Sequence, residues 1–111
     1  MRVKQKCVEY ALSLLSGKWK LQIIWELSGA SSVRFNELRR RLEGISSHML
    51  SRSLRELESE NLVRRVQYEE IPPKVEYSLT ELARALEPTL REMSEWAYVV
   101  YRVNRKGEGL S

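Results

Sequence analysis

Apolar residues recur every three or four positions through the first quarter of the chain. Residues 8–15 follow this spacing until Ser16 and Gly17 interrupt it, and residues 18–27 follow it again. Such spacing gathers apolar side chains on one face of a helix, so two helices are predicted here. After a loop rich in serine and glycine, residues 33–35 are predicted to form a very short strand.

Two short helices joined by a glycine-containing turn are predicted next. Asn36 is a good N-terminal cap for a helix over residues 37–42. Gly44 then suits a left-handed turn, and Ser46 can cap a second helix that ends at Asn61. This order of elements is typical of a helix-turn-helix.

The second of these helices has two different faces. Leu50, Leu54 and Leu57 form a narrow apolar stripe. The opposite face of its first half is polar or positive and has no acid, and it consists of Ser47, His48, Ser51, Arg52 and Arg55. Such side chains suit a DNA major groove, where arginine binds guanine bidentately and serine and histidine serve several bases. Arg55 is assigned to phosphate, and Ser46 either presents backbone N–H groups to a phosphate or acts as a cap alone.

The hydrophobic period changes after this helix. Residues 63–69 and 75–79 are rich in β-branched and aromatic residues, which is typical of strands. Pro72 and Pro73 lie between them and lack the N–H groups that regular pairing needs. A β-hairpin that directly follows a helix-turn-helix is a wing.

The last element is predicted to be a helix from its cap at Thr80 to about Asn104, split by Pro88 near residues 85–87. Its apolar positions repeat in steps of four and three residues, and a chain this short has little core left to cover them. We therefore expect a second copy of the chain to cover them. The predicted dimer-interface residues are Val8, Leu12, Leu86, Leu90, Met93, Trp96, Ala97 and Val100.

These elements predict a mainly α-helical winged helix-turn-helix with a small β-hairpin. A single domain is expected over residues 1–111, since the length allows little more than one. Its parts would be a helix-turn-helix at 36–61, a wing at 62–79, a dimerisation helix at 80–104 and a frayed tail at 105–111.

Charge is distributed unevenly along the chain. The net charge of +4 divides into +6 over residues 1–65 and −2 over residues 66–111. A basic half favours a polyanion such as DNA as partner. Lys18, Arg34 and Lys74 flank the predicted DNA surface and are candidates for phosphate contact, or else ordinary surface cations. One residue of the run 39–41, which is three arginines, is also expected to reach a phosphate.

Composition argues against several other classes. The chain has no Asp, one histidine (His48) and one cysteine (Cys7), so a Ser-His-Asp triad and an intramolecular disulfide are impossible. Counting alone leaves a Ser-His-Glu arrangement open. No glycine-rich phosphate loop, metal site or cofactor is expected, and the chain is predicted not to be an enzyme. The absence of a long apolar run and of a secretory signal predicts a cytoplasmic protein without membrane contact.

Several motifs resemble those of the HxlR-type transcriptional regulators, winged-helix proteins akin to the MarR group. The resemblance covers Cys7 to Trp96, and its motifs are Gly17-Lys18-Trp19-Lys20, residues 34–39, Gly44-Ile45-Ser46, residues 50–58 and residues 72–82. It implies a homodimeric, sequence-specific DNA-binding regulator whose N- and C-terminal helices form the dimer interface. The family often carries glutamine where this chain has His48 and Arg52, so its operators do not transfer.

Cys7 is a candidate redox site. Some HxlR-type regulators sense oxidants or electrophiles through a lone N-terminal cysteine, and the expected position of Cys7 at a helix start near Lys4 and Lys6 would favour the thiolate. The family usually opens this helix with Cys-Pro, an apolar residue and an acid, whereas Cys7-Val8-Glu9 lacks the proline. The thiol is thereby turned by about 100° around the helix. An inert, small apolar role stays open.

The function predicted from these observations is transcriptional regulation through double-stranded DNA. The protein would be a repressor whose two recognition helices, roughly 34 Å apart, occupy a near-palindromic operator. Two other classes stay open, namely a winged-helix protein–protein adaptor and a small thiol-dependent enzyme that uses Cys7 or His48. The residues identify neither an effector nor the operator.

Overall fold

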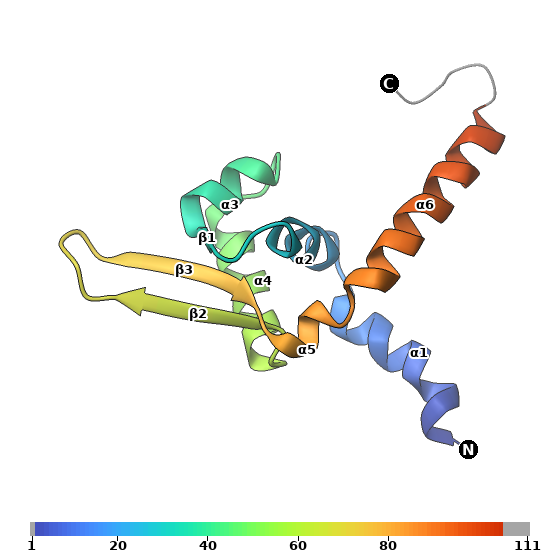
Figure 1. Cartoon of the computed structure of the whole chain (residues 1–111), viewed down its shortest axis with the longest axis horizontal. Coiled ribbons are helices and arrows are strands. Elements are labelled where there is room, and N and C mark those ends of the chain that lie inside the picture. The colour runs from blue at the N-terminus through green and yellow to red at the C-terminus, as the bar shows by residue number, and fades with distance from the viewer. Residues whose placement is uncertain (1, 106–111) are drawn as a thin grey trace.

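The computed structural model describes residues 2–105, with side chains from residue 6 onward. The predicted frayed tail therefore lies, except for Arg105, outside the described residues. In chain order the elements are α1 (Arg2–Leu15), α2 (Lys20–Ser28), β1 (Val33–Arg34), α3 (Phe35–Arg41), α4 (Ser47–Ser59), β2 (Val63–Tyr68), β3 (Lys74–Leu79), α5 (Glu81–Arg84) and α6 (Glu87–Asn104) (Figure 1). The predicted mainly helical fold with a β-hairpin is confirmed.

The three strands form one antiparallel sheet in the order β1-β3-β2. β2 and β3 pair along their whole length, from Val63 opposite Leu79 to Tyr68 opposite Lys74. The hairpin extends well beyond the helices as a wing (Figure 1). β1 contributes only two residues, and Phe35 already belongs to α3.

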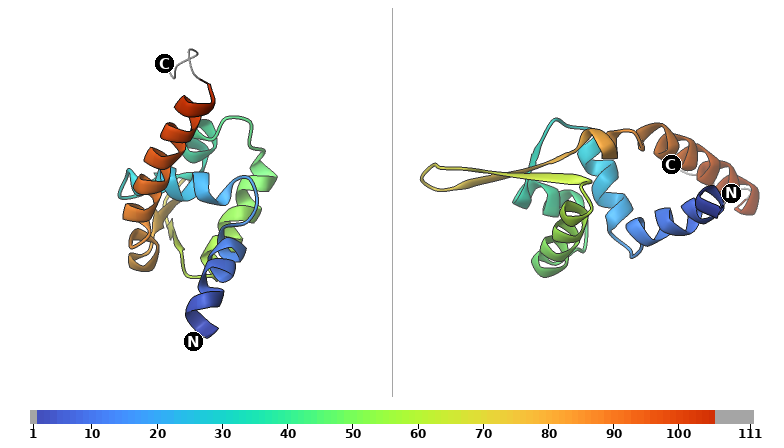
Figure 2. Two further views of the ribbon diagram at one scale, coloured as in Figure 1. Left: turned by 90° about the vertical axis from the view of Figure 1, so that its right-hand side faces the viewer. Right: turned by 90° about the horizontal axis from the view of Figure 1, so that it is seen from below.

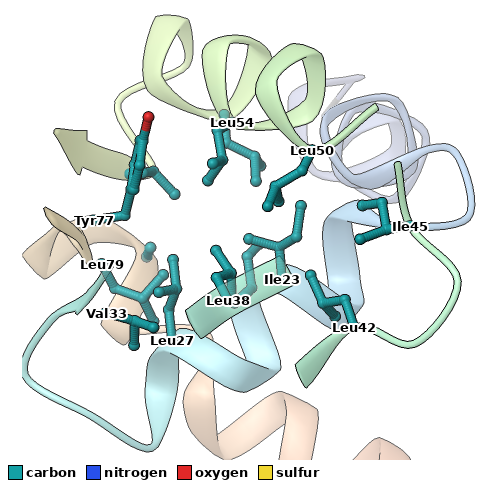
Figure 3. Close-up of a cluster of buried hydrophobic side chains, with 14 of the residues drawn as sticks. Ile23, Leu27, Val33, Leu38, Leu42, Ile45, Leu50, Leu54, Tyr77 and Leu79 are labelled. Atoms are coloured by element: carbon teal, nitrogen blue, oxygen red, sulfur yellow. The ribbon is translucent and has the colours of Figure 1, made fainter. Parts of the chain in front are cut away.

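α2, α3 and α4 enclose the core, and the sheet closes one side of it (Figure 3). Leu50 and Leu57 on α4 have no exposed surface, and Leu54 is 1% exposed. These leucines pack with Ile23, Leu27, Leu38, Val33, Tyr77 and Leu79. Because truncating such a leucine to alanine costs about 2–5 kcal/mol, the stripe fixes the orientation of α4 and of its polar face.

The turn between α3 and α4 follows the sequence prediction. Gly44 has φ 91°, the left-handed conformation that glycine adopts at little cost. The Ser46 hydroxyl accepts a hydrogen bond of 3.1 Å from the Met49 backbone N–H and caps α4. Asn61, just after the helix, has φ 62°. All three are local signals, and all three are confirmed.

The predicted cap at Asn36 is wrong. α3 begins at Phe35, and its N-cap residue is Arg34, which forms no side-chain capping bond. Arg34 is paired with Glu76 in the sheet, so the chain passes from strand to helix without a free residue between them. The Phe35 ring lies 6.4 Å from the Tyr77 ring, measured between centroids, and this contact holds the first turn of α3 in place of a cap.

The C-terminal region is divided as expected. Thr80 caps α5, because its hydroxyl accepts a hydrogen bond of 3.1 Å from the Ala83 N–H. The chain then turns at Ala85 and Leu86, and Pro88 lies in the first turn of α6, where its missing N–H costs nothing.

α1 and α6 project from the side of the molecule opposite the wing tip (Figures 1 and 2). They diverge as they leave the body (Figure 1). None of the described helices is long and apolar enough to cross a membrane. The body therefore presents two separate surfaces, one at α4 and the wing and one on the projecting helices.

Candidate nucleic-acid interface

The predicted polar face of α4 is intact and open to solvent. Ser47, His48, Arg52 and Arg55 are exposed, and Ser51 is half-buried. No acidic residue lies in the first turn, so the partial positive charge of the helix N-terminus is not offset there. The core therefore holds this face on the outside of the molecule in one orientation.

Arg52 is held by a neighbour that the sequence analysis did not single out. Its Nε lies 3.3 Å from Oε2 of Glu56, one turn further along α4. The second carboxylate oxygen of Glu56, Oε1, lies 2.9 Å from Nζ of Lys20 on α2. The bonds from Lys20 and then from Arg52 lower the pKa of Glu56 below its ordinary value. The four-residue spacing could have indicated the first pair, whereas only the packing of α2 on α4 brings Lys20 there.

The three candidates for phosphate contact differ in their surroundings. Lys18 is exposed, and its Nζ lies 4.7 Å from the centre of the Trp19 ring. Arg34 is exposed beside a hollow of about 690 Å³ between α3 and the wing. Lys74 is half-buried, and its Nζ lies 3.8 Å from a carboxylate oxygen of Glu70 and 3.8 Å from one of Glu76. Its charge is already paired within the wing.

The three consecutive arginines of α3 are also unequal. A Glu37 oxygen lies 2.7 Å from Nη2 of Arg40, and its other oxygen lies 3.2 Å from Nε of Arg41. These two hydrogen bonds, that of Arg40 first, lower the pKa of Glu37. Arg39 is exposed and forms no ion pair with the side chains described here. Of the three, Arg39 is the cation left for an external anion.

The predicted apolar seam of α6 divides into a covered part and a free part. Leu90 is buried in the chain's own core and Leu86 is half-buried against it, so neither offers much surface to a partner. Trp96 is 67% exposed, and Met93, Ala97 and Val100 are exposed as well. The sequence analysis missed the exposed Val99 and Val103, although their spacing of three and seven residues from Trp96 is helical. On α1, Val8 and Leu12 are both about two-thirds exposed.

The expectation that Cys7 lies at a helix start is wrong. α1 begins at Arg2, so Cys7 lies in its second turn. The free N–H groups of a helix belong to its first turn, and the favourable effect of the dipole on an anion falls off beyond it. The thiol is exposed.

Metal-binding groupings were also considered. Within residues 2–105, no three His, Cys or Glu side chains gather where they could hold a metal ion. His48 and Cys7 lie on different helices, α4 and α1.

Comparison with known proteins agrees with this architecture. The model of the HxlR-like helix-turn-helix family matches residues 14–107. An HTH-type transcriptional regulator from Halalkalibacterium halodurans is 49% identical over 87 residues, which are 78% of this chain and 77% of that protein. YdzF, an HTH-type transcriptional regulator from Bacillus subtilis, is 43% identical over 95 residues, which are 86% of this chain and 87% of YdzF.

Solved structures give the same result. The redox regulator HypR in its reduced form superposes with a TM-score of 0.78 at 43% identity, covering 89% of this chain and 93% of HypR. The family match spans most of the chain, and the relatives match over most of their own length. The chain belongs to the HxlR-like helix-turn-helix family.

Proposed function

We propose that this protein is a transcriptional regulator that binds double-stranded DNA sequence-specifically through α4. The observation that carries the proposal is the exposed, acid-free first half of α4, fixed by its buried leucines beside a protruding wing. A helix of this kind enters a major groove with its N-terminal residues toward the base edges. The names of the relatives, which are transcriptional regulators, support the same function.

The side chains divide between base and phosphate contacts. Ser47, His48, Ser51 and Arg52 face the base edges, and Arg55 contacts a phosphate. Ser46 already accepts the capping bond from Met49, so its contribution to DNA is the positive end of α4. Among the flanking cations, Lys18 and Arg34 are the exposed phosphate anchors. Lys74 shapes the wing instead, because two carboxylates already pair with it.

The functional unit is a homodimer through α1 and α6. Both helices carry exposed apolar residues away from the body, among them Leu12, Trp96 and Val103. Beside them, a hollow of about 300 Å³ between α2 and α6 is lined by Trp25, Leu90 and Met93. A second copy would bury these surfaces, and its two-fold symmetry would present two recognition helices to successive major grooves. Bound to a promoter, such a dimer represses by excluding other proteins.

Oxidation of Cys7 is the proposed signal. The thiol is exposed on α1, one of the two helices assigned to the dimer interface. HypR, a structural neighbour, is named a redox regulator. Modification of Cys7 would change how α1 packs against the partner and would therefore change the spacing of the two recognition helices.

The test is selection of bound sequences from random duplex DNA, followed by affinity measurements across salt concentrations. Enrichment of a near-palindrome whose half-sites lie about one helical turn apart is expected. If the dimer neutralises about 6–10 phosphates, affinity should fall by roughly 10³–10⁵ between about 50 and 200 mM salt. Absence of enrichment, or binding insensitive to salt, would favour a protein–protein adaptor.

Two variants separate the roles of the arginines. Arg55→Ala should weaken binding to all duplexes alike and reduce the salt slope by about one, as expected for a phosphate contact. Arg52→Ala should relax the preference at one base pair of each half-site. If Arg52→Ala instead weakens binding to all sequences equally, Arg52 contacts phosphate.

A further inference from the structure

Glu56 uses both of its carboxylate oxygens, one for each of two cations. Oε2 lies 3.3 Å from Nε of Arg52, and Oε1 lies 2.9 Å from Nζ of Lys20. The Lys20 side chain is only 15% exposed, whereas that of Arg52 is 61% exposed. The bond to Lys20 therefore anchors the carboxylate to α2, and the carboxylate in turn holds the more mobile arginine.

The atom of Arg52 that is held decides which of its atoms remain available. A guanidinium has five N–H donors, one on Nε and four on the two terminal nitrogens. The carboxylate is bonded at Nε, so both terminal nitrogens are left to donate. A pair of parallel donors matches the O6 and N7 acceptors on the major-groove edge of guanine. The same carboxylate obstructs contacts that would need Nε.

Glu56 also limits what Arg52 can do on the wrong sequence. A free arginine on a helix surface can follow any nearby phosphate, which gives affinity without specificity. An arginine tied at Nε loses part of that freedom and keeps the direction that a base edge requires.

We propose that Glu56 is a positioning residue for recognition of guanine: anchored by Lys20, it orients Arg52 so that the terminal nitrogens of Arg52 read one guanine in each half-site. This inference rests on the proposed DNA-binding function. It assigns a role to Glu56 and Lys20, which lie outside the set of residues expected to touch DNA.

The experiment compares two duplexes, the one selected by the wild-type protein and one in which the base pair read by Arg52 is replaced. Arg52→Ala identifies that base pair as the position where preference is lost, and guanine is expected there. The wild-type affinity ratio between the two duplexes should be about 5- to 150-fold. Glu56→Ala should reduce this ratio by about 3- to 30-fold, while its affinity for unrelated DNA stays the same or rises because a negative charge is gone.

Three further variants keep the result specific to this contact. Glu58→Ala is the matched control, since it removes the same charge from an exposed position of α4 that has no ion pair among the described side chains. It should leave the ratio unchanged. Lys20→Met should reduce the ratio partly, because Glu56 loses its anchor but still reaches Arg52. In the Arg52→Ala background, Glu56→Ala should have no further effect on the ratio.

Several outcomes would overturn the inference. An unchanged ratio in Glu56→Ala, or an equal loss of affinity for every duplex, would show that Glu56 does not act through Arg52. A base other than guanine at the identified position would also contradict it. Thermal unfolding monitors folding of each variant, and surface ion pairs contribute so little that Glu56→Ala is expected to fold. Failure of the wild type to bind any duplex would overturn the proposed function as well, whereas wild-type discrimination that is independent of Glu56 would overturn this inference alone.

Discussion

Nζ of Lys74 lies 4.4 Å from the centre of the Tyr68 ring, and the two residues face each other as the outermost pair of the β2–β3 ladder. Carboxylates of Glu70 and Glu76 lie 3.8 Å from the same ammonium group. A cation over an aromatic face contributes about 0.5–1 kcal/mol at an exposed site and more where it is shielded from water. Lys74 therefore ties together the strand ends at the base of the wing loop.

Lys74→Ala should loosen the wing and leave the electrostatics of DNA binding nearly unchanged. Loss of the ring contact and of two weak ion pairs should cost about 0.5–1.5 kcal/mol and speed amide hydrogen exchange near Tyr68. Because the ammonium charge is already paired, the salt slope of DNA binding should hardly change. Arg34→Ala, at an exposed cation, is the comparison and should lower the slope by about one. A similar fall for Lys74→Ala would place Lys74 on phosphate.

Trp96→Glu and Val103→Glu should convert the dimer to monomers. Both side chains are at least two-thirds exposed on α6 in a single chain, and a partner that covers them would have to bury the new charge. Sedimentation equilibrium over a range of concentrations measures the change, with circular dichroism to check folding. Arg91→Ala, an exposed polar position of the same helix, is the control and should remain dimeric. If the wild-type protein is a well-folded monomer, the assignment of α1 and α6 to an interface is wrong.

Glu37 should make stability depend on pH in acid. Its bonds to Arg40 and Arg41 lower the pKa of Glu37 below its ordinary 4.5 in the folded protein. A carboxyl with a lowered pKa contributes stability that is fully present above its ordinary value and is lost as the pH falls through the folded value. Glu37→Gln should therefore be slightly less stable than wild type at neutral pH, and the difference should disappear in acid.

Urea denaturation at neutral pH and at several pH values below 4.5 measures this difference. The effect should be small, because the ion pairs of Glu37 are solvent-exposed and screened. Glu43→Gln, at an exposed position without an ion pair among the described side chains, is the control and should follow the wild type. A Glu37→Gln difference that is constant with pH would mean that the ion pairs are not its cause.

Oxidation of Cys7 should weaken operator binding. The chain has one thiol, so a disulfide must join two subunits or add a small thiol to the exposed sulfur. Bridging two copies requires Cα atoms within about 7 Å, and a mixed disulfide has no such requirement. The affinity of wild type and Cys7→Ser is measured before and after diamide with a small thiol, and mass spectrometry records the modification. Only the wild type should lose affinity. If its affinity is unchanged with Cys7 modified, the thiol has no regulatory role.

The sequence by itself determined the elements whose signals are local. Gly44 and Asn61 have left-handed backbones, and Ser46 and Thr80 cap their helices, as predicted. Each of these signals depends on residues within four positions, so the rest of the molecule need not be known. The polar face of α4 was equally predictable, because helical spacing fixes which residues lie opposite the leucine stripe.

Only the tertiary structure decided which of these residues are free to act. Lys20 reaches Glu56 across 36 positions of sequence, and Leu90 is buried while Val103 on the same helix is exposed. Asn36 lost its expected role as a cap because the pairing of Arg34 with Glu76 moved the start of α3. The energy of an ion pair, a covered face or a displaced cap depends on which distant segment packs against it. That choice is made by the core as a whole, and no local pattern records it.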